Sequence, residues 1–336
     1  FLMNKKITII AEAGVNHNGK LSQALKMIDA ASKAKADYIK FQTFDPKSVT
    51  TMNLGLAEYQ KKGSSNKTHF KLLDNLKLSK KDFIKIIKKF KKKKIKFLSS
   101  PFDINSIKLL KKLKVNTFKI PSGEINNIPY LKYIGSLKKK IILSTGMSDL
   151  VEVKNAINIL TKNGMKKKNI SILHCSTEYP ANIGKLNLMS VKYLKDKLKL
   201  NVGYSDHSIG YEASLIALAF GAQIFEKHFT LNKFAKGPDH KASLSPKELV
   251  NYVKKLNDFK KSIGGYQKKP YKEELRIAKI ARKQIVALSK IKPGDKFSTK
   301  NITTKRAKQG ISASQWNNVL GKHSKFYFDE DQNIKI

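Results

Sequence analysis

Short apolar runs that end in polar residues recur along the first 230 residues of the chain. Between them lie stretches with apolar residues three and four positions apart, which is typical of helices with one buried face. Strands that alternate with such helices indicate βαβ units and a parallel sheet. Eight units predict a closed (β/α)8 TIM barrel, with an open, doubly wound sheet as the alternative. The predicted strands cover 7–14, 36–44, 95–103, 115–124, 139–147, 170–180, 201–208 and 222–230.

Each predicted strand ends in residues that can hydrogen bond or titrate. A polar residue at one strand end is an ordinary turn residue, but in a (β/α)8 barrel all eight carboxyl ends meet at one mouth, where the chemistry takes place. Eight such ends in succession therefore predict the rim of an active site. The strand-end residues are Glu12, Lys40, Gln42, Ser100, Lys119, Ser122, Ser144, Thr177, Tyr179, Asp206, His207, Glu226 and His228.

The chain changes character after Gly265. The glycine pair at 264–265 and the QKKP segment that follows mark a boundary. We therefore predict a barrel domain over 1–265, a linker over 266–281 and a small α+β domain over 282–336. A domain of about 55 residues is small for independent stability, so we expect it to dock on a barrel. Within the barrel, the long connection 45–80 predicts a lid or a substrate-binding arm.

The formal net charge of +43 suggests nucleic acid or an anionic surface as a partner. However, only three of the 68 basic residues are arginines, and bidentate recognition of phosphate or guanine favours arginine. The lysines are spread along the chain, and the densest run, 80–97, predicts an amphipathic helix with a solvated lysine face. A nucleic-acid or anionic-surface binding protein therefore remains the non-enzyme alternative, and attraction of anionic small molecules is the milder interpretation.

The single cysteine, Cys175, excludes an internal disulfide and fits a reducing compartment. No stretch is apolar over a length that spans a membrane, and the run at 1–10 is too short for a signal peptide. We expect a cytoplasmic protein with neither a membrane nor a nucleic-acid partner. Any metal site must use His, Asp or Glu.

Two histidines end consecutive predicted strands, which are neighbours in a barrel. His207 and His228 could together hold a divalent first-row ion with open coordination positions, and Asp206, Glu226 and Asp239 could act as ligands or orient them. The alternative is that each histidine merely ends a strand; for the pair we favour a metal. His174 is interpreted as a core or orienting histidine, and the role of His17 is left open.

Lysines and hydroxyls at the same mouth indicate an anion site. Lys40 and Lys119 act as point charges, and glycines in SGE (122–124) and STGM (144–147) leave room for backbone N–H groups to approach an oxyanion. A phosphorylated acid is a reasonable substrate. Glu12 lies among small residues, where a carboxylate can orient a sugar hydroxyl or move a proton, or else serve as the partner of a lysine.

The ordered motifs also resemble a known family. AEAGVNHNG, KFQTF, SSPFD, KIPSGE, LSTGM, LHCSTEYP, YSDHS, EKHFT and GPDHKASL are similar to segments of the sialic acid synthase family. The tail segment NITTKRAKQGIS resembles the signature of its C-terminal antifreeze-like (SAF) domain. The resemblance implies a metal-dependent transferase that condenses phosphoenolpyruvate with N-acetylmannosamine, giving N-acetylneuraminate and phosphate by C–O cleavage. The alternative sugar is a 2,4-diacetamido hexose, which gives legionaminic acid; pseudaminic acid is less favoured.

The resemblance also implies roles for single residues. Glu12, His207 and His228 would be catalytic, and the two histidines would bind Mn²⁺, Mg²⁺ or Co²⁺. Phosphoenolpyruvate would be held by Lys40, Ser100, Lys119, Ser122, Ser144 and Ser205. The sugar would be bound by Gln42, Asn66, Thr177, Tyr179, Asp239 and Arg306, the last reaching into the partner's barrel in a domain-swapped homodimer. The chain departs from the family pattern at KRAKQG, where KRPGNG is usual, and at Thr177, where some members have asparagine.

Overall fold

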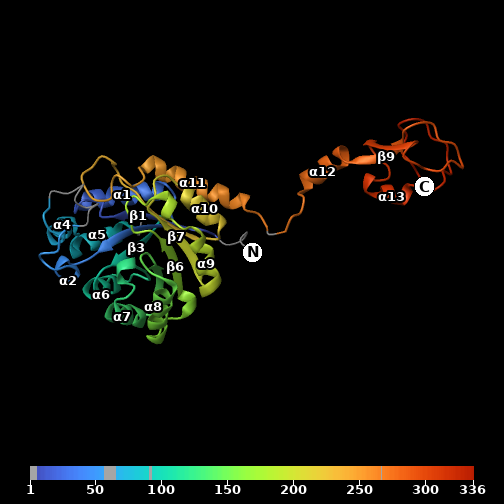
Figure 1. The fold of residues 1–336 in the computed structure, drawn as a ribbon. Coiled ribbons are helices and arrows are strands. Elements are labelled where there is room, and N and C mark those ends of the chain that lie inside the picture. Colours follow the sequence, from blue (N-terminus) through green and yellow to red (C-terminus); the bar gives the residue numbers. More distant parts are fainter. Residues whose placement is uncertain (1–5, 57–65, 91–92, 266) are drawn as a thin grey trace. The chain divides into compact units, whose positions relative to one another are not determined.

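The computed structural model describes residues 6–56, 66–90, 93–265 and 267–336. The chain forms two compact units, Phe1–Gly265 and Tyr266–Ile336 (Figure 1). Each unit has its own hydrophobic core. The middle of the predicted arm, 57–65, and the first five residues lie outside the described part.

The first unit is a closed barrel of eight parallel strands in sequential order, in which the first strand pairs with the last. The predicted (β/α)8 barrel is confirmed, and the open-sheet alternative is wrong. Every strand lies inside its predicted range. The strands are β1 (Thr8–Gly14), β2 (Tyr38–Thr43), β3 (Lys96–Pro101), β4 (Thr117–Ile120), β5 (Lys140–Ser144), β6 (Ile170–Cys175), β7 (Asn201–Asp206) and β8 (Ile224–His228).

Helices follow the strands and surround the barrel (Figure 1). Side chains define several of their starts: Asp149 and Ser245 each form a capping box with a glutamate three residues later, which satisfies free backbone N–H groups. The surrounding helices are α1 (Leu21–Lys33), α5 (Lys80–Phe90), α6 (Ile104–Lys112), α7 (Ile128–Ser136), α8 (Leu150–Lys162), α9 (Met189–Leu198), α10 (Glu212–Ala219) and α11 (Pro246–Ser262). The described part of the long connection after β2 holds the helices α2 (Pro46–Val49) and α4 (His69–Leu76).

The lysine-rich helix predicted over 80–97 is shorter than expected. Helix α5 ends at Phe90, and Lys96 already begins β3. Phe83 and Ile86 form the buried face of α5, while its lysines are exposed or half-buried. Phe97, at the end of the predicted range, therefore belongs to β3 and not to the helix.

A layer of apolar side chains closes the lower part of the barrel lumen. We call it the apolar floor; it consists of Ile10, Leu98, Ile142, Leu173 and Ile224. Alternate residues of a strand face the same side, so the residues two positions later also point into the lumen. Those residues are Glu12, Ser100, Ser144, Cys175 and Glu226. The two-residue period thus places a polar layer directly above the apolar floor, at the carboxyl ends of the strands.

The second unit contains α12 (Lys272–Ala281), the antiparallel pair β9 (Lys283–Ala287) and β10 (Ile302–Arg306), and α13 (Trp316–Val319). Its core includes Ile285, Phe297 and Phe328. The range 266–281, where a linker was predicted, holds helix α12, because Glu274 accepts a hydrogen bond from the Tyr271 N–H at the helix start. The arrangement after residue 282 is α+β; its assignment as an antifreeze-like domain stays a prediction. Across the described part of the chain, no helix combines the length and apolarity needed to cross a bilayer.

Candidate active site at the mouth of the barrel

A cavity of about 450 Å³ opens at the carboxyl ends of the strands. Most residues that the sequence predicts for the site line it: Glu12, Lys40, Gln42, Ser100, Lys119, Ser122, Ser144, Thr177, Tyr179, Ser205, His207, His228 and Asp239. Asn66 is not among the lining residues; its Oδ1 accepts a hydrogen bond from Asn75 at 2.9 Å. Arg306 ends β10 in the second unit and is exposed, so its contact with a barrel stays a prediction.

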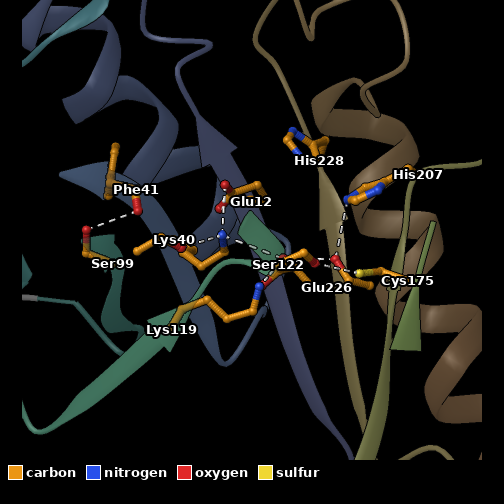
Figure 2. A network of polar contacts seen from close by, with 12 residues as sticks. Glu12, Lys40, Phe41, Ser99, Lys119, Ser122, Cys175, His207, Glu226 and His228 are labelled. Carbon is orange, nitrogen blue, oxygen red and sulfur yellow. Dashed lines mark hydrogen bonds and ion pairs between the residues drawn. The ribbon is translucent and has the colours of Figure 1, made fainter. Parts of the chain in front are cut away.

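Two lysines and two glutamates form a buried cluster at the base of the cavity (Figure 2). The Lys40 Nζ lies 2.9 Å from Glu12 Oε1 and 3.6 Å from Glu226 Oε1, and the Lys119 Nζ lies 3.2 Å from the same Glu226 oxygen. Ser205 donates to that oxygen at 2.9 Å. The second carboxylate oxygens of Glu12 and Glu226 are buried and have no hydrogen-bond partner among the described residues.

The two carboxyl groups of this cluster titrate very differently. Burial raises the pKa of Glu12 to about 7, although the charge of Lys40 opposes the rise. Burial acts in the same direction on Glu226, but Lys119 and Lys40 outweigh it and lower the pKa of Glu226 to about 2. Glu226 is thus a fixed anion, while Glu12 can give or take a proton near neutral pH.

The central position of Glu226 in the polar cluster was not predicted from the sequence. The sequence predicts Glu226 as a rim residue and as a possible metal ligand or orienting group, whereas the structure makes Glu226 the acceptor that both lysines and Ser205 share. Its position near the end of a strand was the signal that Glu226 belongs to the site. What the sequence lacks is the identity of the partners, which come from strands far away in the chain.

His207 and His228 face each other across the mouth, with ring centroids 5.4 Å apart. The Nδ1–H of His207 donates to the carbonyl oxygen of Ser176 at 2.5 Å, which leaves its Nε2 on the side of Ser205. Burial lowers the pKa of His207 to about 4, and that of His228 falls well below its ordinary value for the same reason. Both rings are therefore neutral at pH 7, the form that binds metal ions. The Tyr179 ring lies 4.1 Å from the His207 ring.

The imidazole pair fits a divalent ion with an open coordination sphere. The His228 Nδ1 is buried, has no hydrogen-bond partner among the described residues, and lies 3.7 Å from Asp239 Oδ2. Within the described ranges, no three His, Cys, Asp or Glu side chains cluster closely enough to form a complete metal cage. Two nitrogen ligands with the remaining positions left to water or substrate are typical of catalytic rather than structural metals. Burial also raises the pKa of Asp239 to about 6.

On the side of the mouth that carries the serine hydroxyls, Ser122 and Thr177 pack closely against Gly146. Its N–H donates to Ser122 Oγ at 3.0 Å, and Ser122 Oγ lies 3.4 Å from Cys175 Sγ. A Cβ at this glycine would lie 2.6 Å from Thr177 Cγ2, which is shorter than real contacts. Glycine therefore lets the backbone pass directly beside Ser122, one of the hydroxyls predicted to hold an anion.

Asp206 is not a metal ligand, and that alternative is wrong. Ser205 and His207 point into the lumen, so the residue between them points to the outer face of the barrel wall. There Asp206 pairs with Lys227 at 3.1 Å and accepts hydrogen bonds from Ser208 and Ser214.

His174 and His17, the other histidines named in the sequence analysis, lie outside the cavity lining. The His174 Nε2 is 2.8 Å from the Leu186 carbonyl oxygen, in agreement with an orienting histidine. His17 is buried, and its Nδ1 accepts from the Gly19 N–H at 3.1 Å.

One sector of the cavity wall is apolar and was not foreseen. It comes from the loops after β1 and β2 and from helix α4, within the predicted arm. The sequence analysis named only Asn66 in this region, because no motif there carries recognisable chemistry. The lining residues of this sector include Val15, Phe44, His69, Leu72, Leu73 and Leu76.

Comparison with known proteins identifies relatives that match nearly the whole chain. Residues 27–268 match the NeuB family. The chain is 48% identical to the N,N'-diacetyllegionaminic acid synthase of Campylobacter jejuni, covering 98% of this chain and 99% of the relative. It is 39% identical to the enzyme of the same name from Legionella pneumophila, over 93% and 89%. Identity to the human N-acetylneuraminate-9-phosphate synthase is 30%, over 97% and 90%.

A solved structure shows the same architecture. The N-acetylneuraminic acid synthetase of Leptospira borgpetersenii, crystallised with citrate, superposes with a TM-score of 0.72. It is 35% identical and covers 82% of this chain and 92% of its own.

Proposed function

Because the chain belongs to the NeuB family of sialic acid and legionaminic acid synthases, we propose that it condenses phosphoenolpyruvate with an acylamino hexose to a nonulosonic acid and phosphate. The sequence alone placed N-acetylmannosamine first. The two relatives named as legionaminic acid synthases are 48% and 39% identical, against 30% for the human N-acetylneuraminate-9-phosphate synthase. This difference supports the 2,4-diacetamido hexose as the first substrate and N-acetylmannosamine as the second.

One observation carries the proposal: two buried ammonium groups and two carboxylates of unequal pKa lie in one cavity with a pair of neutral imidazoles. Phosphoenolpyruvate is a small trianion, and Lys40 and Lys119 can bind its carboxylate and phosphate in a site screened from water. Ser100, Ser122 and Ser144 add hydroxyl donors on the same side of the cavity. Such donors favour charge that moves onto the phosphate as its C–O bond breaks.

His207 and His228 would hold the divalent ion, Mn²⁺ or a similar metal, which when bound supplies Lewis-acid polarisation of an aldehyde oxygen. The chain's own groups would do the rest. The imidazoles stay neutral, Ser176 orients the His207 ring, and Asp239 lies beside His228 to bind a sugar hydroxyl.

The proposed condensation first forms a C–C bond and then releases phosphate. The methylene carbon of phosphoenolpyruvate attacks the aldehyde carbon of the open-chain sugar, and the aldehyde oxygen takes up a proton. Water adds to C2 and loses a proton. The tetrahedral carbon then expels phosphate by C–O cleavage, while its hydroxyl proton passes to the departing phosphate and the C2 keto group forms. Glu12, with a pKa of about 7, is the group suited to give the proton to the new hydroxyl.

We further propose that residues 282–336 form the antifreeze-like domain and that the protein acts as a domain-swapped homodimer. The motivation is Arg306, which the family resemblance assigns to the sugar and which ends β10 in a separate unit.

The test is phosphate release by chelator-treated protein, with and without added Mn²⁺, with product identification by mass spectrometry. We expect release only when Mn²⁺, phosphoenolpyruvate and an acylamino sugar are all present. Release without any sugar would contradict the condensation. A panel of N-acetylmannosamine and 2,4-diacetamido hexoses then ranks the sugars.

A further inference from the structure

The walls of the cavity differ in chemistry from one sector to the next. The imidazoles lie at or just after the carboxyl ends of β7 and β8, and the hydroxyls of Ser100, Ser122 and Ser144 lie at or just after those of β3 to β5. The remaining sector, which we call the α4 compartment, is lined by Val15, Phe44, His69, Leu72, Leu73 and Leu76. It is contiguous with the charged base of the cavity, so a molecule bound at the lysines can extend into it.

Packing holds the apolar wall of the α4 compartment in place. Val15, Leu72 and Leu76 form a small buried cluster of their own, against which Phe44 packs. The Phe44 ring also meets the Phe102 ring edge-on, with centroids 6.4 Å apart. A wall fixed in this way favours an apolar group of defined shape over water.

His69 is the polar group of this wall. It lies in the first turn of α4, whose start is fixed by Thr68 accepting from the Lys71 N–H at 3.3 Å. The His69 Nδ1 is buried and has no hydrogen-bond partner among the described residues. Burial lowers the pKa of His69, so its imidazole is neutral. A neutral ring with one unpartnered nitrogen is suited to a neutral polar group and not to an anion.

The described residues that line this sector include no cation. The lysines among the described lining residues are Lys40 and Lys119, and both already contact glutamates at the base of the cavity. A phosphate group pushed against the leucines would lose its hydration without gaining a counter-charge. An amide with a terminal methyl group would bury the methyl on the leucines and satisfy the histidine.

We propose that the α4 compartment binds a second, neutral acylamino substituent of the sugar, with its methyl group against Leu72, Leu73 and Leu76 and its amide on His69. The inference rests on the proposed function and deepens it. The enzyme would select sugars with two acylamino groups and reject sugars phosphorylated at the far end. These residues thus determine specificity, while the chemistry remains at the lysines, glutamates and imidazoles.

The experiment compares kcat/KM for three sugars: a 2,4-diacetamido hexose, N-acetylmannosamine and its 6-phosphate. For the wild type we expect a preference of about 10-fold or more for the diacetamido sugar over N-acetylmannosamine, as for one additional group in a fitted pocket. His69→Phe keeps an aromatic ring but removes both ring nitrogens, and should reduce this preference about 2- to 10-fold. Leu73→Lys introduces a cation, and should abolish the preference and raise kcat/KM for the phosphorylated sugar.

Asp74→Lys is the matched control, because it places the same side chain one residue further along α4 on the exposed face. It should leave the preference unchanged. If Asp74→Lys and Leu73→Lys favour the phosphorylated sugar equally, long-range electrostatic attraction explains the effect, and the proposed role of the α4 compartment is wrong. Equal kcat/KM of the wild type for the diacetamido sugar and N-acetylmannosamine, or equal losses for all sugars in the variants, would also overturn it.

Failure of the proposed function would look different: no sugar would support phosphate release by the wild type. In that case, binding of the diacetamido sugar is measured by calorimetry, with phosphoenolpyruvate present and the metal chelated. This measurement tests the α4 compartment independently of catalysis. Binding that His69→Phe weakens 2- to 10-fold supports it. Binding that is absent or unchanged in this variant refutes it.

Discussion

Lys227 offers a direct test of how the barrel wall holds the site. Its ammonium group is buried on the outer face of β8, 3.1 Å from Asp206 Oδ2, and donates to the Ser208 carbonyl oxygen at 2.5 Å. Asp206 and Lys227 are register partners between β7 and β8. The next residue along each strand, His207 after Asp206 and His228 after Lys227, faces the inside of the barrel. The ion pair therefore joins the two strands directly behind His207 and His228.

We expect Lys227→Met to destabilise the protein by about 3–5 kcal/mol, because it leaves a buried carboxylate without its counter-charge. Three hydrogen bonds from Ser208 and Ser214 still reach Asp206, which places the expected value near the lower end. The matched control is Lys192→Met, which removes an exposed i,i+4 ion pair with Asp196 and should cost less than about 1 kcal/mol.

The assay is urea unfolding of the full chain, followed by far-UV circular dichroism, with the difference taken from the midpoint and slope of the barrel transition. Adding Asp206→Asn to Lys227→Met removes the unpaired charge and should recover part of the loss. A midpoint for Lys227→Met that moves no further than that of Lys192→Met would refute the assignment of a stabilising buried pair.

The remaining predictions concern the site. Glu12→Gln should lower kcat by about 10²–10⁴; if Glu12 acts as the proton donor, wild-type activity falls as pH rises through about 7, and this limb disappears from the pH profile of the variant. His207→Ala should weaken Mn²⁺ binding about 100-fold or more by calorimetry, whereas His323→Ala, at an exposed position of the second unit, should leave it unchanged. Arg306→Ala and Glu12→Gln, each inactive alone, should recover about a quarter of wild-type activity when co-expressed, since half of the dimers are mixed and each mixed dimer has one intact site; no recovery would contradict a site shared between subunits.

The barrel was predictable because its signals are local. A strand of six residues with a polar end can be recognised without knowing its neighbours, and the two-residue period then decides that Lys40 and Lys119 face inward. The same period, applied more strictly, would have turned Asp206 outward. The pairing of Glu226 with two lysines depends on closure of the barrel, which no single segment encodes.

The α4 compartment was missed for another reason. Apolar residues in a connecting segment ordinarily indicate a small core cluster, and Leu72 and Leu76 do form one. Their exposure to a cavity follows only from where α4 lies over the strand ends. The sequence likewise gave no reason to expect helix α12, because its start depends on a single hydrogen bond between Glu274 and the Tyr271 N–H.

The apolar floor also constrains the order of events. In the described part of the barrel, its five residues Ile10, Leu98, Ile142, Leu173 and Ile224 form a buried layer below the cavity, so reactants and products would enter and leave at the mouth. A molecule that contacts Lys40 and Lys119 occupies the deepest position and would be blocked by a sugar already in place. Phosphoenolpyruvate would therefore have to enter first, which makes the kinetic mechanism sequential and ordered, with the sugar as the second substrate.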